Sequence, residues 1–242
     1  MSELTTHPGE TVNEAIAPRL NPPPRLYSYA ALAVAALVLA GFAPSYYLRA
    51  FLAGRHLTPL VHLHGVLMTS WIVLFATQAT LIRKGQVKLH RRLGVFGAAL
   101  AAVIVTVGSL TVAAAIERRF PGVSPRRFGR IFVEFDGLSL WLFGALVVAA
   151  ILYRSRSDAH KRLMLCATAA LLPPAVGRIA EHLLGRDSDW NLLVAAATTS
   201  AFVVICALAD ALRLKRVHPA MAWGAASVLA ANLLTQLAQV GD

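Results

Sequence analysis

Two histidines and a glutamine lie inside a long uncharged stretch of this sequence, residues 60–82, which is long enough to cross a bilayer. Polar side chains at such a depth are costly and tend to be functional. On a helix, one face of this stretch would carry five side chains spaced along its turns: His64, Met68, Trp71, Phe75 and Gln78. His62 would point to the opposite face. The mixed polar and aromatic face either packs against neighbouring helices or presents His64 as a ligand to a metal or haem.

More residues of the same chemistry are expected at the same end of a helical bundle as His62 and His64. They are Glu134, Asp136, Arg178, Glu181 and His182. Because imidazole and carboxylate groups suit zinc, copper or iron, we predict a metal site with these ligands: His62, His64, Glu134, Asp136 and His182. Two imidazoles from facing helices would also suit haem iron, with His64 and His182 as the first choice. The alternative is charge pairing, in which Arg130 neutralises Glu134 and Arg178 neutralises Asp136 or Glu181.

Three further histidines, His90, His160 and His218, each come directly before an apolar stretch, among arginines and lysines. Histidines in such places most often cap a helix or meet lipid head groups. His90 and His160 would nevertheless form a second histidine pair at the other end of the bundle, as a two-haem electron conduit requires. No apolar stretch carries two histidines at the spacing of the quinol-oxidising b cytochromes, so we exclude that class.

The composition is that of an integral membrane protein. The chain is 57% hydrophobic and only 14% charged, with a mean hydropathy of +0.61, which predicts an all-α, polytopic transmembrane bundle. The net charge of +11 does not indicate nucleic-acid binding, because lysines and arginines are concentrated in the short links between apolar stretches. Cys166 and Cys206 both fall inside expected spans, without a CxxC pattern, and are interpreted as packing residues.

Hydropathy predicts seven spans. Their ranges are about 26–47, 60–82, 93–116, 131–153, 163–184, 191–212 and 219–240. Pro173 and Pro174 should kink the fifth span, because proline lacks the amide donor and clashes with the preceding turn. Residues 1–25, with a run of three prolines and no apolar core, are expected to be a disordered cytoplasmic tail, and residues 26–242 form the transmembrane domain.

The charges of the links predict the orientation. The tail and the links after spans two, four and six carry 14 lysines and arginines, against 8 in the other links. The positive-inside rule then places the amino terminus in the cytoplasm and the carboxyl terminus in the periplasm of a bacterial inner membrane. Five arginines in the link between spans three and four oppose this orientation.

A weak internal repeat relates spans two and three to spans four and five. Residues 62–65 (HLHG) align with residues 134–137 (EFDG), and residues 89–93 (LHRRL) align with residues 159–163 (AHKRL). Parallel repeats of this kind occur in membrane proteins. The repeat predicts that spans two to five form the core as two hairpins.

Several of these motifs together resemble those of a group of bacterial inner-membrane proteins without an assigned activity. They are HLHG at 62–65, Gln78, LHRRLG at 89–94, AHKRLM at 159–164 and LLPPAVGR at 171–178, and the resemblance covers most of residues 44–222. The sequence is more distantly similar to membrane proteins of cytochrome oxidase assembly and to four-helix b-type cytochromes. The resemblance implies a helical-bundle fold, a role for His62, His64, His90 and His160, and haem or copper as the ligand.

Three functions are therefore considered. The first is a redox or oxidase-assembly protein that binds haem b or a transition metal, with a respiratory-chain or other membrane protein as partner. The second is a metal, small-ion or proton-coupled transporter, suggested by Asp136, Arg178, Glu181 and the proline break. The third is a structural membrane partner without a ligand. Glycines in the third span, Gly94, Gly97 and Gly108, would serve the bundle or a homo-oligomer equally well.

Overall fold

The computed structural model of the chain describes residues 25–52, 57–134, 137–186, 188 and 190–240. Within these ranges every regular element is a helix. The elements are α1 Arg25–Phe42, the π-helix η1 Ala43–Tyr47, α2 Arg49–Leu52, α3 Pro59–Arg83, α4 Val87–Arg119, α5 Pro125–Glu134, α6 Gly137–Leu152, α7 Ser157–Ala169, α8 Pro173–Leu184, α9 Trp190–Leu214 and α10 Pro219–Val240. The expected tail lies outside the described residues, apart from Arg25.

The predicted polytopic helical bundle is confirmed. Among the described residues, six helices are long and apolar enough to cross a membrane, and α5 with α6 would form a seventh span if the pair is counted as one bent element. The fourth span therefore differs from the expected continuous helix. Residues 125–132 and 137–152 are bent by 67° relative to each other, so Glu134 lies in α5, and at Gly137 the Phe132 ring occupies the place of a Cβ atom. Asp136 lies outside the described residues.

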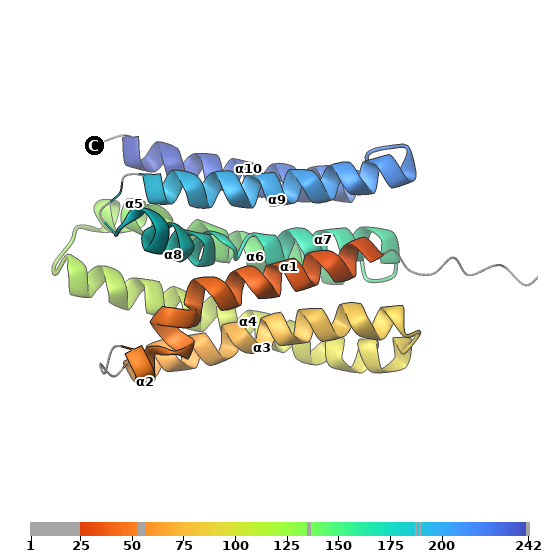
Figure 1. Cartoon of the computed structure of the whole chain (residues 1–242), viewed down its shortest axis with the longest axis horizontal. Helices are drawn as coiled ribbons and strands as arrows, with labels where there is room; N and C mark the ends of the chain where they lie inside the picture. Colours follow the sequence, from red (N-terminus) through yellow and green to blue (C-terminus); the bar gives the residue numbers. More distant parts are fainter. Residues whose placement is uncertain (1–24, 53–56, 135–136, 187, 189, 241–242) are drawn as a thin grey trace, which may run out of the picture.

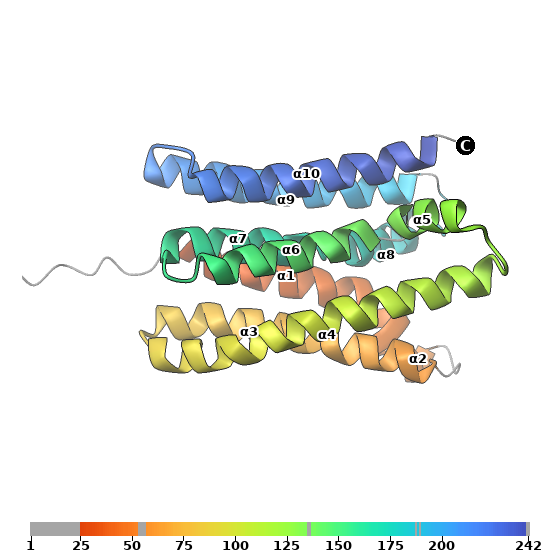
Figure 2. The ribbon, with the colours of Figure 1, turned by 180° about the vertical axis from the view of Figure 1, so that it is seen from behind.

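The helices form three layers, which Figures 1 and 2 show from opposite sides. One layer is the α3–α4 hairpin, the middle layer contains α6, α7 and α8, and the third is the α9–α10 hairpin. Helix α1 packs on α8 and α3. All three hairpin turns lie at the end of the bundle where α1 begins, called here the N-terminal end. The two hairpins expected from the repeat are present as α3–α4 and α6–α7, with α4 packed against α6.

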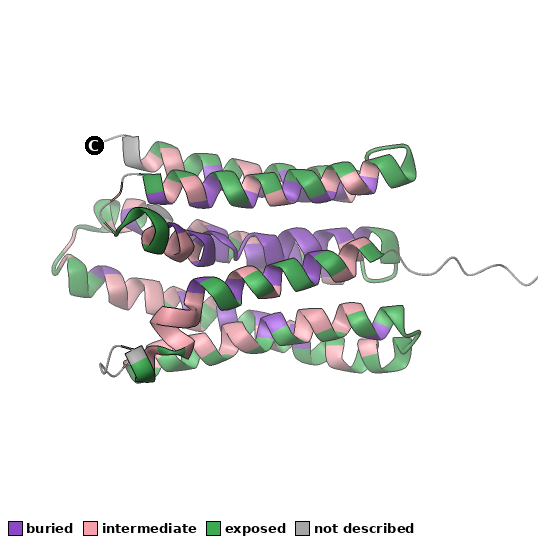
Figure 3. Ribbon diagram, in the orientation of Figure 1, coloured by how far each residue is buried: buried purple, intermediate pink, exposed green. Residues whose placement is uncertain are grey.

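The broken span α7–α8 is the centre of the bundle. In its most apolar window 72% of residues are buried, compared with 17% for α3. Figure 3 shows the buried residues concentrated on the middle layer. The break falls at residues 170–172, and Pro173 and Pro174 begin α8, where their missing amide donors are not needed. The predicted interruption at the two prolines is present, and the core extends beyond spans two to five, because α1, α9 and α10 also pack on this centre.

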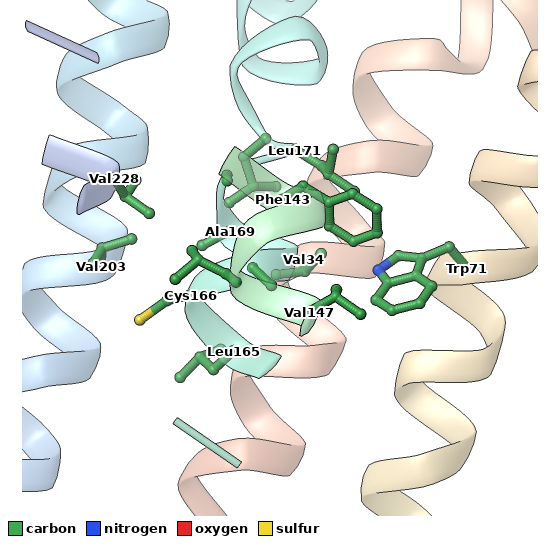
Figure 4. Close-up of a cluster of buried hydrophobic side chains, with 14 of the residues drawn as sticks. Val34, Trp71, Phe143, Val147, Leu165, Cys166, Ala169, Leu171, Val203 and Val228 are labelled. Atoms are coloured by element: carbon green, nitrogen blue, oxygen red, sulfur yellow. The ribbon is translucent and has the colours of Figure 1, made fainter. Parts of the chain in front are cut away.

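Trp71 links the α3–α4 hairpin to the middle layer. Its indole packs edge to face on Phe143 of α6, with ring centroids 4.8 Å apart. Figure 4 shows the indole nitrogen turned toward the Phe143 ring, beside Val34 and Val147. Aromatic pairs of this geometry contribute about 0.5–1.5 kcal/mol beyond their buried area. The face of α3 that carries Trp71 therefore faces inward, as the sequence predicted.

A buried ion pair joins the centre to its neighbours near the N-terminal end. Arg162 of α7 and Asp210 of α9 are each only 2% exposed, and the guanidinium binds both carboxylate oxygens at 2.6 and 2.8 Å. The hydroxyl of Tyr27 in α1 donates to the same carboxylate at 3.1 Å, and Arg162 also donates to the Asp158 carbonyl at 2.6 Å. The network therefore ties together three helices that are distant in sequence.

We predict that Asp210→Ala strongly destabilises the protein. Removing one partner of a buried ion pair leaves an uncompensated charge and costs about 3–5 kcal/mol. The matched control is Asp158→Ala, which breaks the pair between an exposed carboxylate and His218 (2.8 Å), and exposed pairs contribute about 0–1 kcal/mol. The measurement is the fraction of monodisperse protein in detergent after heating over a range of temperatures. Equal losses in the two variants would contradict the assignment.

Candidate functional site

Two histidines from different hairpins meet near the N-terminal end. His90 of α4 and His160 of α7 have ring centroids 6.3 Å apart, with the ring planes at 86°. Both residues were expected just before their spans, whereas the helices begin earlier, at Val87 and Ser157. Each histidine is thus the fourth residue of its helix. The sequence motifs LHRRL and AHKRL place them at equivalent positions of the two hairpins.

The backbone fixes the His160 ring. Its Nδ1 lies 2.8 Å from the carbonyl oxygen of Ala150 in α6. Because a carbonyl can only accept, Nδ1 carries the proton, and in a neutral imidazole Nε2 then keeps its lone pair. Histidines that bind metals almost always donate their second ring nitrogen to a carbonyl or carboxylate in this way. His160 is therefore oriented as a ligand would be.

The surroundings of His90 leave polar atoms without partners. The Gln78 side-chain amide of α3 donates to the His90 carbonyl at 3.2 Å. The Gln78 Oε1 and the His90 Nδ1 are both buried and have no hydrogen-bond partner among the described residues. A buried polar atom without a partner costs about 1–3 kcal/mol. The region between α3 and α4 is therefore incompletely satisfied.

The spacing of the two rings has two physical interpretations. A ring nitrogen lies about 1.1 Å from its ring centroid and about 2 Å from a bound metal, so two imidazoles on opposite sides of one ion have centroids about 6 Å apart. The observed 6.3 Å matches this value. An ordinary edge-to-face contact between rings covers a range of about 4.5–7 Å and also includes it. Only the orientation of His160 and the unpartnered atoms favour a ligand.

The ligand count distinguishes haem from a bare metal ion. Within the part of the chain that the structure describes, no three histidines, cysteines, aspartates or glutamates come together as a metal-binding group. A bare zinc ion usually needs three or four protein ligands. Haem supplies four nitrogens of its own and needs only two axial ligands. Two histidines are the number of protein ligands that a haem would need.

At the opposite end, His64 faces the helices α4 and α6. A Cβ atom on Gly108 would lie 2.7 Å from the Leu140 side chain and 3.5 Å from the His64 ring. The His64 Nδ1 is buried and has no hydrogen-bond partner among the described residues. His62 is exposed on the other face of α3, with its ring centroid 6.0 Å from that of Tyr46. The two neighbouring histidines therefore have different surroundings, as expected from their spacing.

Of the other residues predicted at this end, the described His182 and Arg178 have surroundings that differ from those of His64, whereas Asp136 and the Glu134 side chain lie outside the described part of the structure. His182 is exposed in the last turn of α8, a helix that packs on α9 and α1. The Arg178 guanidinium lies 5.3 Å from the Phe42 ring centroid, and it forms no ion pair with Glu181 in the described part of the chain. Glu134 belongs to the separate helix α5. The structure therefore brings together His90 with His160, but not His64 with His182.

Comparisons of the chain with protein-family models, with curated proteins and with solved structures find no match. The assignment of the site therefore depends on its geometry. That geometry includes partners that sequence reasoning did not predict, the Ala150 carbonyl for His160 and the Gln78 amide for the His90 backbone. Gln78 was identified as an inward polar residue, but no local pattern indicates which atom it contacts.

Proposed function

We propose that this protein is a redox protein of the bacterial inner membrane that binds one haem b between His90 and His160, in electron transfer or oxidase assembly. The contact between these two imidazoles, from separate hairpins and at the spacing of axial ligands, is the observation that carries the proposal. The hydrogen bond from His160 to Ala150 and the unpartnered His90 Nδ1 support it. A haem in this position would supply one-electron chemistry.

The residues of the chain favour electron transfer over reactions with a bound substrate. Two imidazoles would fill both axial positions, which leaves no open position for oxygen or another small ligand. Because His90 and His160 belong to different hairpins, the cofactor would also connect α3–α4 to α6–α7. The exposed Arg91 and Arg92 at the same end offer positive charge for the haem carboxylates.

A transporter is the second candidate, because the central span of the bundle is interrupted between α7 and α8, and many carriers have interrupted spans. A transport path needs polar side chains at the break. Residues 169–176, which surround the break, are alanines, leucines, prolines and a valine, and nearly all are buried. This apolar break favours the redox function.

We predict that protein purified from haem-replete cells shows a Soret band and a low-spin, bis-imidazole spectrum, with one haem per chain. His90→Ala and His160→Ala should each abolish the low-spin spectrum, because each removes one axial ligand. The controls are His62→Ala and His218→Ala, which change histidines outside the pair and should keep it. Absorption and electron paramagnetic resonance spectra, with a pyridine haemochrome assay, measure the outcome.

Two results would overturn the haem proposal. The first is a clean, monodisperse preparation from haem-replete cells without a Soret band. The second is an unchanged low-spin spectrum in the double variant His90→Ala, His160→Ala. The rings would then be an aromatic contact that packs α4 against α7.

We further propose that the N-terminal end of the bundle faces the cytoplasm. The larger number of lysines and arginines in the links at this end supports that orientation.

The test of this orientation uses Lys84→Cys and Ser124→Cys, at exposed positions of opposite ends. In intact spheroplasts a membrane-impermeant maleimide should label Cys at position 124 and label position 84 only after permeabilisation. The buried native Cys166 and Cys206 should give little background, which the unsubstituted protein controls. The reverse labelling pattern would invert the topology.

A further inference from the structure

A group of buried sulfur atoms lies between α7, α9 and α10, away from the histidine pair. The Cys166 Sγ is 3.8 Å from the Met221 Sδ, and both residues are only 1% exposed. Cys206 of α9 is 5% exposed and belongs to the same buried cluster as Cys166 and Met221. Figure 4 shows the Cys166 sulfur turned away from Phe143, toward the side of the bundle where Val203 and Val228 lie. Both cysteines are free thiols.

A glycine on α10 leaves space for the Cys166 sulfur. A Cβ atom on Gly224 would lie 2.8 Å from the Cys166 Sγ, so glycine leaves the space that the sulfur occupies. His218, Met221 and Gly224 are three residues apart and therefore share one face of α10. Along this face His218 contacts Asp158, and Met221 contacts Cys166. A row of metal-binding side chains thus leads inward from the half-buried His218 at the N-terminal end.

The sulfur ligands of these three side chains favour a soft monovalent metal ion. Thiolate and thioether ligands prefer Cu(I), whereas carboxylate and carbonyl ligands prefer harder ions. Three sulfurs at about 2.3 Å from one ion in a trigonal plane are about 4 Å apart, and two in a linear arrangement are about 4.6 Å apart. The observed 3.8 Å fits the trigonal arrangement. The third sulfur would come from Cys206, the only other cysteine in the sequence.

We infer that Cys166, Met221 and Cys206 form a Cu(I)-binding site in the interior of the bundle. The Cys166 thiol releases its proton to solvent and its thiolate bonds to Cu(I), while the Met221 thioether and the Cys206 thiol, which keeps its proton, each donate a sulfur lone pair. The copper ion and one thiolate together are neutral, so the complex avoids the cost of burying a net charge. No electron is transferred in this step. The inference is independent of the haem proposal, because none of the three sulfurs belongs to the histidine pair.

The test is an anaerobic titration of the purified full-length protein with Cu(I) in competition with a chromophoric Cu(I) chelator. We expect one Cu(I) per chain and, in X-ray absorption spectra, a first shell of sulfur only. Cys166→Ala and Met221→Leu should each weaken binding by about tenfold or more, because each removes one of three ligands. Met221→Leu keeps the volume of the side chain and so tests the sulfur itself. Met164→Leu, on α7 outside the group, is the matched control and should bind Cu(I) normally.

The outcomes separate this site from the proposed haem site. If both sites are correct, His90→Ala keeps Cu(I) binding, and Cys166→Ala keeps the haem spectrum. The copper inference fails if the native protein cannot retain Cu(I) against the chelator, or if Met221→Leu and Cys166→Ala bind it as tightly as the native protein does. A copper shell of nitrogen or oxygen would also overturn it. Cys166 would in that case be a packing residue.

Discussion

The bidentate ion pair between Arg162 and Asp210 is the interaction on which the N-terminal end of this bundle depends. It is almost completely buried, and it also bonds to the Tyr27 hydroxyl and the Asp158 carbonyl. In a low-dielectric interior such a pair tolerates little displacement, because a misaligned pair leaves a buried charge without compensation. Arg162 therefore fixes the position of α7 against α9 and α1. His160, two residues earlier, and Cys166, one turn later, take their positions from it.

The hydrogen bonds of buried polar groups are satisfied around Arg162, whereas several buried polar atoms of the α3–α4 hairpin lack partners. Around Arg162 the guanidinium and the carboxylate have partners, whereas the α3–α4 hairpin contains buried atoms without hydrogen-bond partners among the described residues: His64 Nδ1, Trp71 Nε1, Gln78 Oε1 and His90 Nδ1. The indole N–H of Trp71 turns toward the Phe143 ring, a weak substitute for an oxygen acceptor. A stable fold carries few such atoms without a purpose. Among the described residues, four of the seven buried side-chain atoms without a partner belong to this hairpin, and the others are Ser45 Oγ, Asn191 Oδ1 and Thr199 Oγ1.

Hydropathy predicted the spans well, because it reports the thickness of the hydrocarbon layer that each helix must cross. It did not predict where helices begin, since charged first turns such as those of α4 and α7 continue the helix into the interface. The break between α7 and α8 could be predicted from two prolines, whereas the 67° bend between α5 and α6 has no such signal in the sequence. The pair of His90 and His160 was expected because both histidines precede apolar stretches at the same end of the bundle. The pairing of Arg162 with Asp210, and of Cys166 with Met221, joins residues at least 48 positions apart that no local pattern connects.

The central helix α7 can serve two sites because its side chains leave it in different directions. At about 100° per residue, His160 and Cys166 lie roughly 120° apart around the axis, whereas Arg162 and Cys166 lie within roughly 40° of each other. One face of α7 therefore presents His160 toward α4, and another presents Arg162 and Cys166 toward α9 and α10. Small buried residues such as Ala167 and Ala169 let neighbouring helices pack closely around α7. Since the ion pair shares the face of the sulfur group, a shift of α9 would disturb the sulfurs before it disturbed the histidine pair.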